Sequence, residues 1–365
     1  MFSKFFKSSV PEEIQEKIKT FFSQYSNEIF SQGIANVCQL LSISAEKKSI
    51  VLSISAPFAC DGALDQFAQD LLTDTNISVL VDCQLNIAPI KRHKVAGVKN
   101  IIAISSGKGG VGKSTTTVNL AYALQAEGAT VAILDADIYG PSIPKMLGLE
   151  KQRVTSADGK TMLPMEVNDL SAMSIGFMVD EGDATVWRGP MASRAFNQML
   201  NETAWQDIDY LLVDMPPGTG DIQLTLAQQV PVAAAVIVTT PQDIALVDAT
   251  KGIAMFNKVN VPVLGVVENM SYHVCNNCGE KAHLFGQGGG ELLSKEYNTE
   301  LLGQLPLDIS ICQQADQGKS SLIENSAGDI AMQYRKIAAK IAAKLYVQRD
   351  TLSPQSNEIF IKQVD

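Results

Sequence analysis

The sequence predicts an α/β fold in which a mostly parallel sheet is flanked by helices, with a small α+β domain before it. Five apolar runs carry this prediction because they lack the alternation of strands that expose one face to water. A glycine-rich loop also joins the first run to a helical pattern, which indicates a strand–loop–helix unit. The runs cover residues 101–106, 130–137, 210–218, 233–240 and 261–270.

The first 90 residues differ in pattern from the rest and are expected to form the α+β domain. Apolar residues recur at three- and four-residue steps over residues 12–30, which predicts a helix. Two short strands are expected around a polar turn at 45–49. A second helix over 63–72 and a third strand over 77–87 complete this domain.

Three further segments complete the predicted organisation. Residues 91–100 form a basic, polar linker, and residues 101–346 form the main domain. Residues 347–365 are polar and are expected to be a flexible tail. The main domain ends in an amphipathic helix over 327–346, with an apolar face made of Ile330, Tyr334, Ile337, Ile341 and Leu345.

Composition argues against several classes of protein. The 365 residues include 39 acidic and 29 basic side chains, a net charge of −10, which disfavours nucleic acid as a partner. No stretch of ~18 apolar residues predicts a membrane span, and the N-terminal residues lack the pattern of a secretory signal. Six cysteines in a chain of this length do not indicate a disulfide scaffold, so a reducing, cytoplasmic setting is expected.

A phosphate-binding loop is predicted between the first apolar run and the helix after it. The segment GKGGVGKST at 107–115 fits the pattern G-x-x-x-x-G-K-S/T in the strand-to-helix context that this motif requires. Backbone N–H groups would surround the phosphates, Lys113 would supply charge, and the Ser114 hydroxyl would ligate Mg²⁺. The predicted nucleotide-binding residues are Gly107, Lys108, Gly109, Gly110, Val111, Gly112, Lys113, Ser114 and Thr115.

Carboxylates follow two of the predicted strands, where they would face the ligand crevice of a parallel sheet. Asp135 and Asp137 end the run at 130–137, and a turn-capping role before Pro141 is the alternative for Asp137. Asp214 is expected to hold Mg²⁺ through a water molecule. The glycines Gly218 and Gly220 resemble a switch loop, and Asp221 would cap the helix after it.

Cys275 and Cys278 form a C-x-x-C pair directly after the last apolar run. One such pair supplies two of the four ligands of a tetrahedral site. Three interpretations are open: His273 or His283 completes a zinc knuckle, the pair is a redox disulfide, or two chains share one four-iron cluster. An isologous dimer would bring two identical pairs together at its two-fold axis.

The loop resembles the deviant Walker A motif, K-G-G-V-G-K-S/T, of the class of MinD, ParA and the nitrogenase iron protein. This resemblance implies a homodimer in which Lys108 reaches the partner's phosphates, so that Lys108, Lys113 and Asp137 are catalytic. Asp137 would activate the attacking water, and Asp135 would lie near the Mg²⁺ ion. Asn269, which ends its predicted strand, would bind adenine and favour ATP, with capping as the alternative.

Larger motifs resemble the Mrp/ApbC family of iron–sulfur cluster carrier ATPases over residues 95–345. They are GKGGVGKSTTTVNLA, LDADIYGPSIPKMLG, VWRGPM, LLVDMPPGTGD and VVENMSYHVCNNCG. The resemblance implies an ATPase that assembles a labile [4Fe–4S] cluster on Cys275 and Cys278 of both chains. Its partners would be a second copy, apo iron–sulfur proteins and scaffold proteins, with neither nucleic acid nor membrane among them. Arg188 would lie near the nucleotide or dimer face, or serve the WRGP turn.

The first domain resembles a degenerate MIP18-type domain. Its APFACDG segment places Cys60 where that domain type has a reactive or ligating cysteine, and the role of Cys60 is left open. Core burial is expected for Cys38 and Cys83, and a structural role for Cys312.

Two other functions remain open for the whole chain. One is an ATP-dependent regulatory switch of the MinD or ParA kind, and the other is a zinc-stabilised ATPase scaffold without a cluster. A membrane-bound switch would end in a basic amphipathic helix, whereas the C-terminal segment NEIFIKQVD is polar and of mixed charge.

Overall fold

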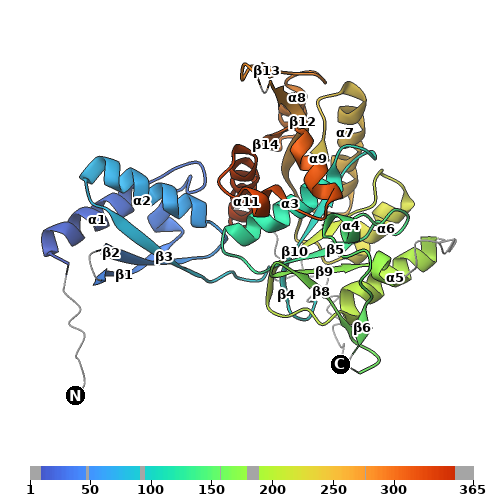
Figure 1. Ribbon diagram of the computed structural model, residues 1–365, viewed down its shortest axis with the longest axis horizontal. Helices are drawn as coiled ribbons and strands as arrows, with labels where there is room; N and C mark the ends of the chain where they lie inside the picture. Colours follow the sequence, from blue (N-terminus) through green and yellow to red (C-terminus); the bar gives the residue numbers. More distant parts are fainter. Residues whose placement is uncertain are drawn as a thin grey trace, which may run out of the picture.

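The computed structural model describes residues 10–46, 49–90, 95–156, 158–178, 189–275 and 277–349. Figure 1 shows a small N-terminal lobe beside a larger α/β body. In the lobe, β1 and β2 pair antiparallel, β2 and β3 pair parallel, and both helices cover one face of this sheet. The elements of the lobe are α1 (Glu12–Gln24), β1 (Gln39–Glu46), β2 (Ser49–Ala56), α2 (Asp61–Thr75) and β3 (Val79–Leu85).

The first helix is shorter than the sequence pattern predicts. It ends at Gln24, and Tyr25 has an extended backbone with ψ 131°. The Asn27 side chain then accepts hydrogen bonds from the backbone N–H groups of Ile29 and Phe30, at 2.9 and 2.8 Å. The prediction of a helix through residue 30 is therefore wrong at its end, because this local turn competes with the helical hydrogen bonds.

The body is built on a mostly parallel sheet, which confirms the predicted fold class. Its strand order is β13-β12-β11-β4-β10-β5-β9-β8, and β14 also pairs with β12. The pairings of β8 and β13 are antiparallel, and both strands lie at the ends of this order. The strands are β4 (Val98–Ser105), β5 (Val131–Asp135), β8 (Met165–Val167), β9 (Leu170–Ser174), β10 (Ile208–Asp214), β11 (Ala234–Thr239), β12 (Val263–Val274), β13 (Lys281–Ala282) and β14 (Leu301–Pro306), with a separate pair of β6 (Thr155–Ser156) and β7 (Met162–Leu163).

Helices cover both faces of the sheet, which explains the apolar runs without alternation. Along β4, Ile102 and Ile104 belong to one buried cluster, whereas Ile101 and Ala103 belong to another. The first cluster includes side chains of α3 and α11, and the second includes side chains of α5 and α7. The helices of the body are α3 (Lys113–Ala126), α4 (Ile143–Met146), α5 (Gly189–Glu202), α6 (Asp221–Gln229), α7 (Asp243–Lys258), α8 (Gly289–Glu296), α9 (Ile309–Asp316), α10 (Ser321–Glu324) and α11 (Asp329–Gln348).

The boundary between linker and body differs from the prediction. Strand β4 begins at Val98, which pairs with Ile208, so residues 98–100 belong to the sheet rather than to the linker. Within the described part of the chain, no helix combines the length and the apolar character needed to cross a bilayer.

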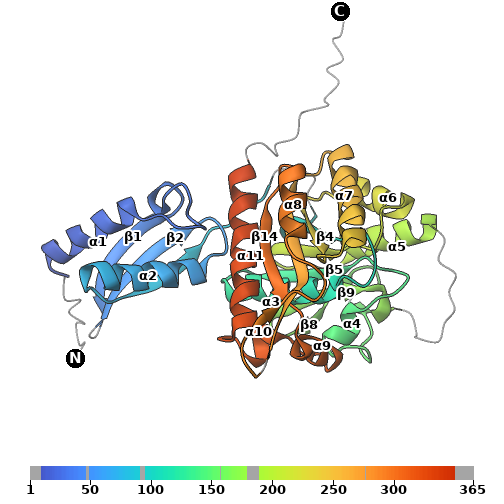
Figure 2. The same ribbon diagram turned by 90° about the horizontal axis from the view of Figure 1, so that it is seen from above.

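The lobe packs against α11 and the end of α3, and Figure 2 shows α11 between the lobe and the sheet. The carboxylate of Glu127, directly after α3, accepts a hydrogen bond from Gly62 N of α2 at 2.7 Å. The same carboxylate forms an ion pair with Arg335 of α11, also at 2.7 Å. The Phe58 and Tyr346 rings add an apolar contact, with their centroids 5.5 Å apart. The helix that begins at the glycine-rich loop thus ends at the N-terminal lobe.

Candidate nucleotide site and cysteine hairpin

The predicted phosphate loop connects β4 to α3, as the sequence indicates. Gly110 and Gly112 have φ values of 82° and 80°, a left-handed conformation that favours glycine. Gly107 is required for space, because a Cβ atom there would lie 2.1 Å from the backbone of Asp248. Gly112 occupies the N-cap position of α3, so the free N–H groups of the first helical turn face the loop.

The charged part of this site is a buried cluster around Asp214, at the end of β10. Lys113 Nζ lies 2.7 Å from Asp214 Oδ1, and these side chains are 6% and 0% exposed. The hydroxyl of Ser114 donates to Asp214 Oδ2 at 2.6 Å. Thr117 also donates to Asp214, at 2.8 Å, and was missed by sequence reasoning. Its spacing of three residues after Ser114, on the same helix face, was the signal available in the sequence.

Asp135, at the end of the neighbouring strand β5, is fully buried. Burial and the nearby Asp214 carboxylate raise the pKa of Asp135 to about 8. Its oxygens accept hydrogen bonds from Ser174 Oγ at 3.0 Å and from Asp137 N at 3.1 Å. The parallel register pairs Asp214 directly with Asp135, so the two acids lie side by side at the carboxyl edge of the sheet.

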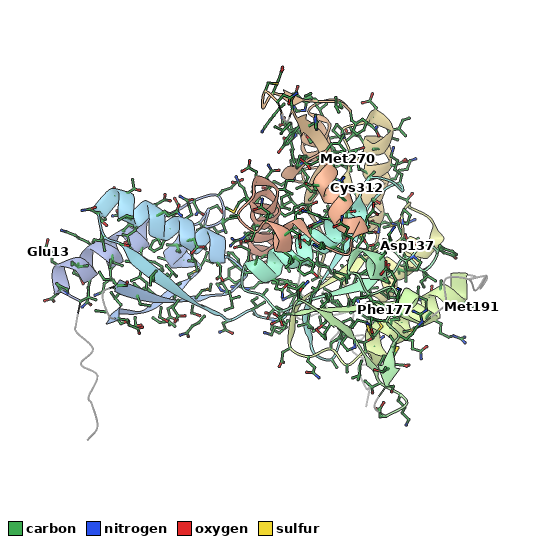
Figure 3. All side chains as sticks on the ribbon, in the orientation of Figure 1. Glu13, Asp137, Phe177, Met191, Met270 and Cys312 are labelled. Carbon is green, nitrogen blue, oxygen red and sulfur yellow. The ribbon has the colours of Figure 1, made fainter. Side chains whose placement is uncertain are left out.

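Asp137 follows in the turn after β5, and Figure 3 labels it there. Burial is the largest influence on its carboxyl group and raises the pKa, while Lys113 acts in the opposite direction. The carboxylate also accepts backbone hydrogen bonds from Tyr139 and Gly140. The backbone hydrogen bonds therefore support the capping alternative, and the influence of Lys113 on the pKa of Asp137 supports the site alternative.

The loop after β10 contacts the end of β4 and the residue just before the phosphate loop. Gly218, with φ 103°, donates its N–H to Ser106 O at 3.1 Å. Gln223, which sequence reasoning also missed, is buried and bonds through Nε2 to both Pro216 O and Ser105 Oγ. Gly220 occupies the N-cap position of α6, and Asp221 is the first helical residue, so the capping prediction for Asp221 is wrong. Trp187 and Arg188 lie outside the described residues.

Asn269 contacts the phosphate loop from β12. Its Nδ2 donates to Val111 O at 2.9 Å, and the side chain is 6% exposed. The sequence places Asn269 at the end of a strand, but β12 continues to Val274 because its last residues pair with β13. Asn269 therefore caps no helix here. Lys108 is half-buried, and its carbonyl accepts a hydrogen bond from Ser106 Oγ at 2.9 Å.

The cysteine pair lies in the turn between β12 and β13. Cys275 N donates to Glu280 O at 2.9 Å, and Gly279 N donates to Cys275 O at 2.8 Å. Hydrogen bonds from the backbone N–H groups of Asn277 and Cys278 lower the pKa of the Cys275 thiol. Gly279 has φ 73°, a conformation that the turn requires. The hairpin thus stabilises a thiolate at Cys275, with the exposed Cys278 beside it.

The histidines near this hairpin bond to backbone carbonyl groups. His273 Nδ1 lies 3.1 Å from Leu307 O, and His283 Nδ1 lies 3.0 Å from Ser271 O. Among the described residues, which include both histidines and both cysteines, no three His, Cys, Asp or Glu side chains are grouped to hold a metal ion. A zinc knuckle within one chain is therefore not assembled by these residues.

The other cysteines divide between the lobe and the surface. Cys60 is completely buried, and hydrogen bonds with the thiols of Cys38 and Cys83, together with burial, raise its pKa well above the usual value. Cys38 is buried, as predicted, but Cys83 is only half-buried. Cys312 is exposed on α9, where it does not contribute to the core.

Comparison with known proteins places this site in a family. A family model described as a NUBPL iron-transfer P-loop NTPase of the ParA group matches residues 97–342. The chain belongs to this family. Its NUBPL-type relatives include an iron-sulfur cluster carrier protein of Escherichia coli, which is 49% identical over 94% of this chain and 95% of the relative.

Two other NUBPL-type relatives differ in how much of the chain they match. The iron-sulfur cluster carrier protein of Haemophilus influenzae is 46% identical over 99% of both chains. The mouse protein named iron-sulfur cluster transfer protein NUBPL is also 46% identical, over 70% of this chain and 80% of its own length. The matches to the Escherichia coli and Haemophilus influenzae proteins therefore include the N-terminal lobe as well as the body.

Solved structures agree with the NUBPL-type fold. A nucleotide-binding protein of Archaeoglobus fulgidus, solved in complex with ADP, superposes with a TM-score of 0.57 at 38% identity. This match covers 64% of the present chain and 91% of the other. The cell division ATPase MinD of Pyrococcus furiosus has a TM-score of 0.50 at 22% identity over 66% and 98% of the two chains, a likeness of fold alone.

Proposed function

We propose that this chain is an ATPase that holds a labile [4Fe–4S] cluster between two copies and transfers it to apo-proteins. The observation that carries the proposal is the connection within one strand. Strand β12 contacts the phosphate loop through Asn269 and leads directly into the thiolate-stabilising hairpin of Cys275 and Cys278. One strand therefore joins the contact with the phosphate loop to the cysteine pair. A carrier regulated by nucleotide requires such a connection.

The nucleotide half of the proposal rests on the buried cluster at the phosphate loop. Lys113 is the counter-charge for the β- and γ-phosphates, and Asn269 is the adenine contact that favours ATP. The oxygen donors of Ser114 and Asp214 lie 2.6 Å apart and, with Asp135 alongside, fit a hard cation such as Mg²⁺. When bound, Mg²⁺ would supply charge neutralisation at the phosphates. Asp137 is the residue that orients the attacking water.

Hydrolysis in this proposal is completed by a second copy of the chain. Lys108 is only half-buried at the phosphate loop, so its ammonium group can extend to a partner's phosphates. A homodimer also supplies the missing ligands, because two chains bring four thiols to one cluster. The same symmetry argument therefore accounts for the half-buried lysine and for the incomplete ligand set.

The remaining parts of the chain follow from the same proposal. The N-terminal lobe is a MIP18-like domain, and apo iron–sulfur proteins and scaffold proteins are the partners. The setting is reducing and cytoplasmic, because Cys275 and Cys278 bind a cluster only as thiolates and not as a disulfide. The names of the curated relatives support cluster transfer as the activity.

Anaerobic reconstitution tests the proposal. The purified chain is supplied with iron and sulfide, its visible spectrum and acid-labile sulfide are measured, and transfer to an apo-protein is followed. Wild type is expected to load a brown, air-sensitive cluster and transfer it. The variant Cys275→Ala/Cys278→Ala is expected to lose both properties, while Cys312→Ala, which removes another exposed thiol, keeps them. Equal loading and transfer by the double variant, or a colourless zinc protein, contradicts the proposal.

A further inference from the structure

Met270 interrupts β12 between the phosphate loop and the cysteine hairpin. Its φ is 55°, in the left-handed region that a non-glycine residue occupies only at a local energetic cost. The pairing of β12 with β14 shifts register between Glu268 and Tyr272, on either side of this residue. The strand is therefore bent at one defined position, and Figure 3 labels Met270 below the hairpin that carries β13.

The bend lets two consecutive side chains face the same loop. In a regular strand, neighbouring side chains point to opposite faces. A Cβ atom added at Gly112 would lie 2.3 Å from Asn269 Nδ2 and 3.6 Å from Met270 Cε. Both side chains therefore lie beside Gly112, and the hydrogen bond from Asn269 Nδ2 to Val111 O is the direct link between β12 and the phosphate loop.

The strand is fixed just before the bend. Glu268 is completely buried, and its carboxylate accepts hydrogen bonds from Gly290 N of α8 at 2.6 Å and Gln304 Nε2 of β14 at 2.8 Å. The Ser271 hydroxyl, just after the bend, also donates to this carboxylate at 2.6 Å. Glu268 therefore anchors the strand before the bend and holds Ser271 beyond it, so Asn269 and Met270 are the two residues between these fixed points.

The hairpin side of the bend is joined to the cysteine turn. His283, on the returning segment after β13, contacts the carbonyl of Ser271 at 3.0 Å through Nδ1. The rings of Tyr272 and His283 pack edge to face, with their centroids 6.4 Å apart. Both sides of the hairpin are thus joined to the backbone immediately after Met270. Cys275 comes directly after the end of β12, so it is joined to the same backbone.

We propose that Met270 is a positioning residue that couples the phosphate loop to the cysteine pair. A nucleotide-dependent shift of Val111 and Gly112 is transmitted through Asn269 and the left-handed backbone at Met270, and it changes the orientation and exposure of the Cys275 and Cys278 thiols. This inference rests on the proposed function, because the pair is taken as the cluster site. It adds the device by which the nucleotide state controls whether cargo is held or released.

Thiol alkylation tests the coupling without any cluster. The reduced full-length chain is treated with iodoacetamide, with and without Mg²⁺ and a non-hydrolysable ATP analogue, and modification is quantified peptide by peptide. The rate at Cys275 and Cys278 is normalised to the rate at Cys312. In wild type, nucleotide is expected to change this ratio at least about fivefold, within the usual range of allosteric coupling.

The variant Met270→Gly removes both the left-handed constraint and the side chain that lies beside Gly112. Its nucleotide-dependent change is expected to fall below about twofold, with nucleotide affinity within about threefold of wild type. The matched control is Asn298→Gly, which places glycine at another left-handed residue (φ 48°) on the exposed turn before β14. A wild-type response in Met270→Gly, or the same loss in both glycine variants, overturns the inference.

Cluster loading separates this inference from the proposed function. Met270→Gly is expected to load a cluster as wild type does, but to release it to an apo-acceptor at a rate that nucleotide no longer changes. Wild-type loading combined with a full nucleotide effect on release in Met270→Gly overturns the coupling and leaves the carrier function intact. Undiminished loading in Cys275→Ala/Cys278→Ala is the separate result that overturns the carrier function.

Discussion

Lys113 and Asp214 form a buried ion pair with 2.7 Å between Nζ and Oδ1. Lys113 begins α3 and Asp214 ends β10, so the pair joins the phosphate loop to the neighbouring strand. The same ammonium group is the expected partner of the nucleotide phosphates, so binding of nucleotide exchanges one anionic partner for another. The site therefore keeps its lysine compensated by negative charge both with and without a nucleotide.

Lys113→Met is expected to abolish ATP hydrolysis and to destabilise the protein. Removing one member of a buried ion pair leaves an uncompensated charge, which costs about 3–5 kcal/mol in the free energy of unfolding. The double variant Lys113→Met/Asp214→Asn removes both charges and is expected to recover much of that stability without recovering activity. Urea unfolding in the absence of nucleotide, with an ATPase assay alongside, checks both statements. Equal destabilisation by the single and double variants contradicts the role assigned to the pair.

Asp135→Asn is expected to stabilise the metal-free protein, increasingly so at higher pH. The pKa of Asp135 is about 8 in the folded chain and near its ordinary value of about 4 when unfolded. The protonated carboxyl group of Asp135 contributes its full share to the free energy of unfolding below about pH 4. This contribution is lost as the pH rises towards 8, by at most about 1.4 kcal/mol per pH unit. Asparagine does not titrate, so the variant does not lose stability in this way as the pH rises.

The measurement for Asp135 is urea unfolding in EDTA at pH 5, 6.5 and 8. The difference in unfolding free energy between Asp135→Asn and wild type should grow with pH over this window. The exposed acid Asp158, whose pKa is lowered by backbone hydrogen bonds from Thr161 and Lys160, provides the control. Asp158→Asn should show no growth with pH between 5 and 8. A pH-independent difference for Asp135→Asn shows that the carboxyl group is ionised throughout.

Glu127→Ala is expected to loosen the N-terminal lobe from the body. The carboxylate is 2% exposed and satisfies both Arg335 Nε and Gly62 N, so its removal leaves two donors without their partner. A lost buried acceptor of this kind costs about 1–3 kcal/mol. The unfolding transitions of lobe and body should separate when followed by hydrogen exchange of α2 and of α11. Glu13→Ala, which breaks the exposed Lys17 pair on α1, should leave both transitions in place.

Sequence reasoning predicted the elements that have strong local signals. The phosphate loop and the strands around it were found because glycine spacing and continuous apolar runs are local properties of the chain. The bend at Met270 was missed because neither the residue type nor its neighbours indicate a left-handed backbone, which accompanies the register shift in the pairing with β14. Tertiary contacts also decide the role of Asn269, which lies inside β12 rather than at its end.

The same limit applies to buried polar residues. Gln223 and Glu268 have no motif, and their roles arise only when α6 meets β4 and when β12 meets α8 and β14. The gathering of Cys38, Cys60 and Cys83 in the lobe is equally invisible in the sequence, because the three residues come from separate elements. Charge and cysteine spacing could be read from the sequence directly, whereas these contacts required the fold.

Gly279→Val is expected to weaken the cysteine pair without removing a thiol. Gly279 has φ 73°, and a β-branched residue is strongly disfavoured there, so the turn that directs N–H groups to the Cys275 sulfur should open. The pKa of Cys275 should then rise towards its ordinary value, which shifts the pH dependence of its alkylation upwards. Cluster loading should fall at the same time, since the ligand is a thiolate. Gly159→Val, at another exposed turn with φ 72°, is the matched control and should leave both measurements unchanged. An unchanged alkylation profile in Gly279→Val shows that the N–H groups of the turn do not set the reactivity of Cys275.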